Sequence, residues 1–166
     1  MTRRHFILIA LIPLLLLTAW HFLSPTRQLK VAQNRLLEAI SSKDAAAIAK
    51  LLHPDYTDPW GFSATDWPGI LKDLRLLSPI LDLKMIDPVL DAAHGVVDTS
   101  LQAKSAGGPA AELIADRAVE LQEPTRFLWK RQPWQPWSWR LVSVQNPALE
   151  IPPGYQPGKL SGIPQL

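Results

Sequence analysis

The feature that most constrains this chain is an uncharged apolar run near its N-terminus. Residues 6–23, FILIALIPLLLLTAWHFL, are eighteen consecutive residues without a formal charge. A helix rises about 1.5 Å per residue, so this run just crosses the roughly 30 Å hydrocarbon core of a bilayer. Pro13 near its middle is tolerated in membrane spans, and Trp20 suits the interface. We therefore expect a transmembrane helix over residues 6–23.

A cleaved signal peptide is the alternative for the same run. The apolar part of a signal peptide is usually only about 7–15 residues long and ends in a small-x-small site. Here the run is longer, and the bulky Leu17 makes Leu17-Thr18-Ala19 a poor cleavage site. We therefore favour a retained signal anchor. The chain has no cysteine, which excludes lipid attachment through a thiol and is compatible with an oxidising compartment.

The flanking cations predict the orientation of the span. Arg3 and Arg4 stand close to its start, whereas Arg27 and Lys30 follow at a greater distance. The positive-inside rule then makes residues 1–5 a short cytoplasmic head and places the rest outside the inner membrane, which is the periplasm in a Gram-negative bacterium. The same two arginines account for the whole net charge of +2. The remainder is neutral with scattered cations, so we expect no nucleic-acid partner.

Helical patterns come first in the remaining chain. An amphipathic helix is predicted over about residues 27–41, and Asp44 is a good N-cap for a second, AAAIAKLL, which Pro54 ends. A third helix has Pro68 in its first turn, ends before Ser78-Pro79, and has Ser63 or Thr65 as its expected cap.

Strand patterns follow. Apolar and polar residues alternate over residues 80–86 and 95–105, with a turn at 91–95 between them. Residues 125–131 and 137–145 are predicted as two more strands, joined by a proline-rich connection over 132–136. Residues 109–117 could be either helix or strand. The tail, residues 149–166, is rich in proline and glycine, and we expect it to be extended or disordered.

This order predicts an α+β domain over residues 24–148. Three N-terminal helices would pack on one face of a curved, mostly antiparallel sheet. The segment RLLEAISSKDAAAIAKLLHPDYTDPWG resembles the opening of nuclear-transport-factor-2-like domains, in particular the SnoaL-like and ketosteroid-isomerase-like branches. FLWKRQPWQPWSWRLVSV resembles their final hairpin. The resemblance covers about residues 27–148. The matching positions of the opening pattern are Leu51, Leu52, Asp55, Asp58, Pro59 and Gly61.

The resemblance implies a cone-shaped fold with a pocket at its open end. In the isomerase-like branch, the Asp of the Asp-Pro-x-Gly element is the general base, and Asp58 matches it. The family's stabilising donors are not reproduced: Leu36 stands where a Tyr is expected, and Thr125 and Arg126 stand nearest to the expected Asp. Ketosteroid-type isomerisation is therefore disfavoured. The simpler interpretation is that Asp58 fixes an Asp-Pro turn by side-chain-to-backbone bonds.

Other residues are candidates for a pocket or a partner site. Trp134, between two prolines, is hard to bury and is a candidate partner-binding residue, although cation–π packing across the hairpin is the simpler role for this aromatic and cationic cluster. Four histidines, without His-x-x-x-His spacing or thiolates, predict no metal site, and no motif predicts a cofactor. The pocket-lining candidates are Tyr56, Trp60, Trp67, His94, Arg126 and Trp129.

Two hypotheses about function follow. The first, which we favour, is a non-catalytic, membrane-anchored extracytoplasmic domain that binds a protein partner or a small apolar ligand, with a homodimer through the sheet as one form of partner. The second is a SnoaL-like enzyme, of isomerase, cyclase or dehydratase type, with Asp58 as general acid or base. An enzyme needs a second polar group near Asp58, from Tyr56, His94 or Arg126. A binding domain would show Asp58 bonded to its own turn.

Overall fold

The computed structural model describes residues 24–107 and 123–160. The predicted head, residues 1–5, and the predicted span, residues 6–23, lie outside these ranges, as do residues 109–117 and the last six residues of the tail. Within the described ranges, no helix has both the length and the apolar character needed to cross a membrane.

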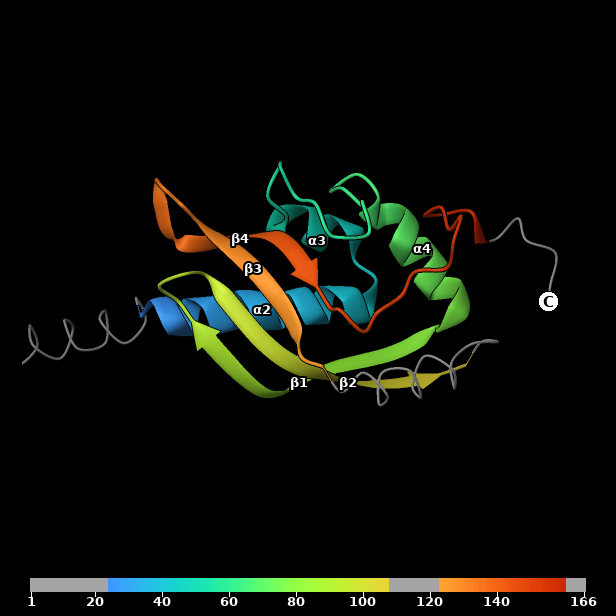
Figure 1. The fold of residues 1–166 in the computed structure, drawn as a ribbon, viewed down its shortest axis with the longest axis horizontal. Helices are drawn as coiled ribbons and strands as arrows, with labels where there is room; N and C mark the ends of the chain where they lie inside the picture. The colour runs from blue at the N-terminus through green and yellow to red at the C-terminus, as the bar shows by residue number, and fades with distance from the viewer. Residues whose placement is uncertain (1–23, 108–122, 161–166) are drawn as a thin grey trace, which may run out of the picture.

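The described chain has the predicted α+β architecture, with three helices packed on a four-stranded antiparallel sheet. The helices are α2 (Pro25–Ser42), α3 (Ala45–Leu51) and α4 (Trp67–Leu77). The strands are β1 (Ile80–Asp91), β2 (Val96–Ala106), β3 (Thr125–Gln132) and β4 (Gln135–Gln145), in the spatial order β1-β2-β3-β4. Figure 1 shows α2 running along one face of the sheet, with α3 and α4 beyond β4.

Local sequence signals explain where the helices begin and end. The Asp44 carboxylate accepts a hydrogen bond from the Ala47 amide at 2.9 Å, which confirms the predicted N-cap of α3. The predicted cap of α4 is wrong. Its N-cap is Asp66, whose carboxylate turns back to accept hydrogen bonds from the amide and hydroxyl of Ser63. The start of α4 therefore has no side-chain cap, because the nearest carboxylate is already bonded in the preceding turn.

The pairing of strands in the sheet is interrupted by register shifts. Strand β1 continues beyond the predicted end because a bulge between Ile86 and Val89 accommodates Pro88, which has no amide to donate. Asp87 takes a positive φ of 48° there, and the buried Thr99 hydroxyl bonds to the Ile86 carbonyl at 2.9 Å. Further register shifts lie in the β3–β4 pair. The bulges support the predicted curvature of the sheet, since each bends the strand that carries it.

The hydrophobic core lies between α2 and the inner face of the sheet. Leu29, Leu36 and Val97 are fully buried there, together with Phe127 and Leu141. The alternation predicted for residues 95–105 is confirmed, since Val97, Thr99 and Ala103 are buried.

The elements gather at two opposite ends of the molecule. The start of α2, the β1–β2 turn and the β3–β4 hairpin lie at one end, and α4 lies at the other (Figure 1).

The tail was predicted to be extended or disordered, but its described part is folded into turns. Residues 152–160 form successive turns that pack beside α4 (Figure 1). The buried Asp73 of α4 accepts hydrogen bonds from the Tyr155 hydroxyl at 2.9 Å and the Gly158 amide at 2.7 Å. Proline and glycine therefore shape a series of turns here, and a buried carboxylate holds them in place.

Candidate functional site

The segment that carries the family resemblance covers an edge of the sheet. Leu52 forms a parallel bridge with Leu141, and the His53 amide donates to the Leu141 carbonyl at 2.8 Å. Farther along, the Thr57 amide donates to the Val142 carbonyl at 3.1 Å. Strand β4 would otherwise present unpaired backbone groups along this stretch. Residues 52–66, which we call the link, connect α3 to α4 and thus close the β4 edge of the sheet.

Asp58 is bonded to its own turn. Its Oδ1 atom accepts hydrogen bonds from the Trp60 amide at 3.1 Å and the Phe62 amide at 2.9 Å. Its backbone completes the turn, because the Gly61 amide donates to the Asp58 carbonyl at 3.1 Å. Gly61 has a φ of 85°, a conformation that glycine adopts without strain. This Asx-type arrangement is the one expected for a structural aspartate.

One polar side chain does stand next to Asp58. The Tyr56 hydroxyl donates to Asp58 Oδ2 at 3.2 Å, and Tyr56 itself is only 3% exposed. Its ring packs edge-on against Trp67, with centroids 6.0 Å apart. Burial, then the charge of Asp58, raises the pKa of Tyr56 far above its ordinary value. Burial also raises the pKa of Asp58, although its bonds to Phe62, Tyr56 and Trp60 oppose that shift.

The remaining aromatic candidates of the link fasten it to other elements. The Trp60 indole donates to the Leu149 carbonyl at 2.9 Å, which joins the link to the start of the tail. Phe62 packs edge-on against Tyr155, with centroids 5.8 Å apart. Trp67 opens α4 and packs against the core. In the described chain, these side chains bind the link to the tail and to the core.

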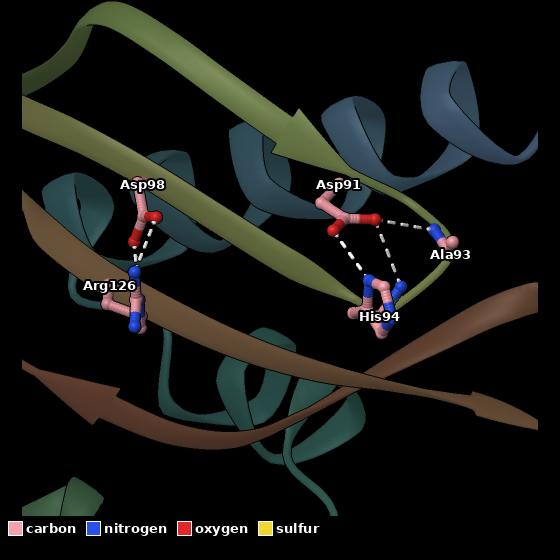
Figure 2. A network of polar contacts seen from close by, with 5 residues as sticks. All are labelled: Asp91, Ala93, His94, Asp98 and Arg126. Carbon is pink, nitrogen blue, oxygen red and sulfur yellow. Dashed lines mark hydrogen bonds and ion pairs between the residues drawn. The ribbon is translucent and has the colours of Figure 1, made fainter.

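His94 and Arg126 do not approach Asp58 as partners. Figure 2 shows each in a separate polar contact. His94 Nδ1 lies 2.6 Å from Asp91 Oδ2 in the β1–β2 turn, with the His94 side chain 78% exposed. The contact holds the pKa of Asp91 below its ordinary value. Arg126 of β3 makes a bidentate pair with Asp98 of β2, with N–O distances of 2.8 and 2.9 Å.

Three of the predicted pocket-lining residues, Arg126, His94 and Trp129, line two separate pockets. A sheet-end pocket of about 530 Å³ is lined by the Asp98–Arg126 pair, by Gln145 at the end of β4, and by Pro59. A hairpin-base pocket of about 640 Å³ includes His94 and Trp129, with Pro25 from the start of α2. The predicted residues are thus distributed over different parts of the surface and do not converge on one cavity.

The inside of the sheet is occupied by side chains. Trp129 is 4% exposed, and its indole donates to Gln33 Oε1 of α2 at 2.9 Å. Gln33 is fully buried, and its Nε2 atom has no hydrogen-bond partner among the described residues. Gln33 is therefore a polar helix residue that faces the core. Its burial could be anticipated from its position beside Leu29 and Leu36 on the same helical stripe.

A third depression is cationic, and the sequence did not single it out. The α2–β4 groove, of about 590 Å³, lies between the outer side of α2, the end of α3 and the first half of β4. Trp137, 60% exposed, forms part of its wall. Alternation along β4 places Trp137 and Trp139 on one face of the strand and predicts that at least one of them is in the core, and Trp139 is buried there. Among the residues that the structure describes, the charged side chains that line the groove are the cations Arg27, Arg35, Lys50 and Arg140.

The hairpin itself confirms the predicted cation–π contact. The Arg131 guanidinium lies 4.9 Å from the centroid of the Trp139 ring. Trp134, in the two-residue connection between β3 and β4, is 92% exposed. No group of three or more histidine, cysteine or acidic side chains among the described residues could hold a metal ion.

Comparison with solved structures supports the fold alone. The chain superposes on the structure of Bdellovibrio bacteriovorus Bd1075 with a TM-score of 0.53 and 10% identity, over 72% of this chain and 40% of that one. It thus spans well under half of that protein. It superposes on the S. rosetta CaMKII hub with a TM-score of 0.53 and 15% identity, over 73% of this chain and 94% of that one.

An NTF2-like protein from Cytophaga hutchinsonii is also similar, with a TM-score of 0.43 and 16% identity, over 87% of this chain and 96% of that one. No protein-family model matches the sequence, and no curated protein matches it. Similarity of fold at these sequence identities does not indicate an activity, because one fold can host unrelated functions.

Proposed function

We propose that the protein is a membrane-anchored extracytoplasmic domain that binds a protein partner and is not an enzyme. The α2–β4 groove is the observation that carries this proposal. It combines an exposed tryptophan with three arginines, the residue types that, with tyrosine, most often dominate binding energy at protein interfaces. No carboxylate among the described residues lines it, so it suits an acidic segment of the partner.

The anchored topology is part of the same proposal. The apolar run of residues 6–23 ends one residue before Ser24, where the described chain begins. A periplasmic domain held by such a span would meet its partner at the membrane surface. A reporter fused after Leu166 checks the orientation. Alkaline phosphatase, which works only outside the cytoplasm, should be active in this fusion, and activity of a cytoplasm-dependent reporter would contradict the orientation.

A small apolar ligand is the weaker form of the binding hypothesis. The space between α2 and the sheet, where such a ligand would sit in a cone, is filled by Trp129, Gln33 and their apolar neighbours. The pockets of the described surface have mixed polar and apolar linings. These features favour a macromolecular partner over an enclosed small molecule.

The SnoaL-like enzyme is the second candidate, and the Tyr56–Asp58 contact is the observation that favours it. A tyrosine beside a carboxylate of raised pKa is one arrangement that proton-transfer sites use. Against it, Tyr56 is buried, and two backbone amides occupy the other Asp58 oxygen. The geometry therefore supports the structural role of Asp58 better than the catalytic one.

Site-specific photocrosslinking tests the binding proposal. A photoreactive phenylalanine analogue replaces Trp137 in the full chain, in membranes of the native host, and Leu76 on α4 is the matched control position, since it is also exposed. We expect a protein adduct from position 137 and none from position 76. The adduct should disappear when Arg35→Glu and Lys50→Glu cancel the net positive charge of the groove. An adduct that persists after this charge cancellation would contradict the groove as the binding site.

A further inference from the structure

The tip of the β3–β4 hairpin stands out because its apolar side chain is almost wholly in solvent. Trp134 is 92% exposed, the highest value among the large hydrophobic residues described. It lies between Pro133 and Pro136 in the sequence, in a connection of only two residues between paired strands. Strands β3 and β4 pair up to Gln132 and Gln135, so the indole is held away from the core by its own hairpin.

The hairpin is also cationic throughout. Residues 125–145 contain Arg126, Lys130, Arg131 and Arg140, and no aspartate or glutamate. Arg126 is paired with Asp98 at the far end of β3 from the tip. Lys130 is exposed close to the tip, and Arg131 is held over the Trp139 ring. An exposed indole is therefore bordered by cations on both strands, within a segment that has no compensating acid.

This tip lies at the end of the domain where the described chain begins. Pro25 and Thr26, the first residues of α2, line the same hairpin-base pocket as Lys130 and Arg131. Figure 1 shows the hairpin tip, the β1–β2 turn and the start of α2 together at one end of the molecule. If residues 6–23 span the bilayer, as proposed above, this end faces the membrane surface directly.

From these observations we propose that the β3–β4 hairpin docks on the bilayer, with Trp134 in the interface and Lys130 against anionic phospholipid headgroups. Tryptophan concentrates at the membrane–water interface, because its ring is amphipathic. Cations close to an anionic leaflet are attracted within about a Debye length, roughly 8 Å at physiological salt. This inference rests on the proposed anchoring and adds a second contact with the same membrane, which would fix how the groove is presented.

Spin labelling of the full chain in lipid nanodiscs tests the docking. The chain contains no cysteine, so Gln135→Cys gives a single labelled site beside Trp134 without removing it. Leu76→Cys, on exposed α4 at the other end, is the matched control. In nanodiscs that contain phosphatidylglycerol, we expect the label at 135 to lose accessibility to an aqueous nickel complex and gain accessibility to oxygen. The label at 76 should stay fully accessible to nickel.

Two further variants show whether the named side chains cause the protection. Adding Trp134→Ser to Gln135→Cys should restore nickel accessibility, and adding Lys130→Glu should restore part of it. Protection should also weaken in nanodiscs of phosphatidylcholine alone. A label at 135 as accessible as that at 76, or protection unchanged by Trp134→Ser, overturns the inference. Protection that appears only after other host membrane proteins are added overturns it too, because the tip would then contact a protein.

The outcome remains separable from the anchoring itself. Alkaline carbonate washing of vesicles that carry the full chain measures whether the chain is integrated. Release of the chain would remove the proposed anchoring. A chain that is retained, yet has an exposed label at position 135, overturns only the docking of the hairpin.

Discussion

Asp73 provides the sharpest test of how this fold is held together. It is 1% exposed on α4, and three donors of the tail converge on its carboxylate. Oδ2 accepts from the Tyr155 hydroxyl at 2.9 Å and the Gly158 amide at 2.7 Å, while Oδ1 accepts from the Leu160 amide at 3.3 Å. We predict that Asp73→Ala releases residues 155–160 from α4.

The magnitude follows from these bonds. A hydrogen bond to a charged group contributes about 1.5–3 kcal/mol net, so the two short bonds set an upper limit of roughly 3–6 kcal/mol. Removing a buried charge recovers part of its desolvation cost, and the freed tail donors can bond to water. We therefore expect Asp73→Ala to lower the free energy of unfolding by about 2–4 kcal/mol. Asp73→Asn keeps one acceptor oxygen and should cost about half as much.

Urea unfolding of the full chain in detergent micelles, followed by tryptophan fluorescence, measures the loss. Hydrogen exchange of the Gly158 and Leu160 amides reports the release of the tail itself. Lys72→Ala on the same helix is the control, because its exposed 3.4 Å contact with the Gly158 carbonyl should matter by less than about 0.5 kcal/mol. A loss below about 0.5 kcal/mol for Asp73→Ala, with unchanged amide protection, would refute the reasoning.

A steric variant reaches the same tail by another route. A Cβ atom added at Gly69 would lie 2.8 Å from the Pro157 carbonyl carbon and 2.9 Å from its oxygen, both backbone atoms. We expect Gly69→Ala to displace the tail and raise the exchange of the Gly158 amide, although Asp73 is intact. Tail protection that survives Gly69→Ala would show that the two segments are less tightly packed than the structure has them.

Three further predictions concern the core and the link. Gly95 has a φ of 70°, and an added Cβ would lie 2.0 Å from the Trp129 carbonyl oxygen, so Gly95→Ala should prevent normal folding, as judged by circular dichroism. Tyr56 and Tyr155 are the only tyrosines, and both pKa values are raised above 10.0, mainly by burial. Folding therefore favours the protonated forms of both tyrosines. Tyrosinate absorbance should stay absent above pH 10 until the protein unfolds, and the free energy of unfolding should fall as the pH rises beyond that value. Titration of the native protein near pH 10 would contradict this. Asp58→Ala leaves two turn amides without their acceptor and should cost about 1–3 kcal/mol in a urea titration, whereas an unchanged midpoint would argue against the turn role.

Much of the fold follows from local signals. The cap at Asp44 and the alternation of β2 each depend on neighbouring residues, so the sequence predicts them directly. The bulge at Pro88 was missed, because a proline predicts a break unless the neighbouring strand supplies a compensating bond. That bond comes from Thr99, which is distant in sequence.

The candidate site was harder to predict, because its residues depend on long-range contacts. The burial of Asp73 could not be predicted from its helix, because the tail that covers it is far away in the sequence. The burial of Gln33 follows from its helical stripe, but its bond to Trp129 does not. The α2–β4 groove joins α2, α3 and β4, whose residues are far apart in sequence. Trp134 was predicted to be exposed, because flanking prolines at a tight connection leave an indole no neighbour to pack against.

The position of Asp58 separates the two hypotheses on energetic grounds. Its carboxylate already accepts three hydrogen bonds, one from the Tyr56 hydroxyl on Oδ2 and two from turn amides on Oδ1. Those bonds belong to a link that also pairs with β4 at Leu141 and Val142, so freeing the carboxylate loosens the sealed edge of the sheet. Trp137, by contrast, is exposed on the hairpin half of β4, where it lines the α2–β4 groove. The bonds of Asp58 therefore support its structural role, and the exposed Trp137 supports the proposal that the groove binds a partner.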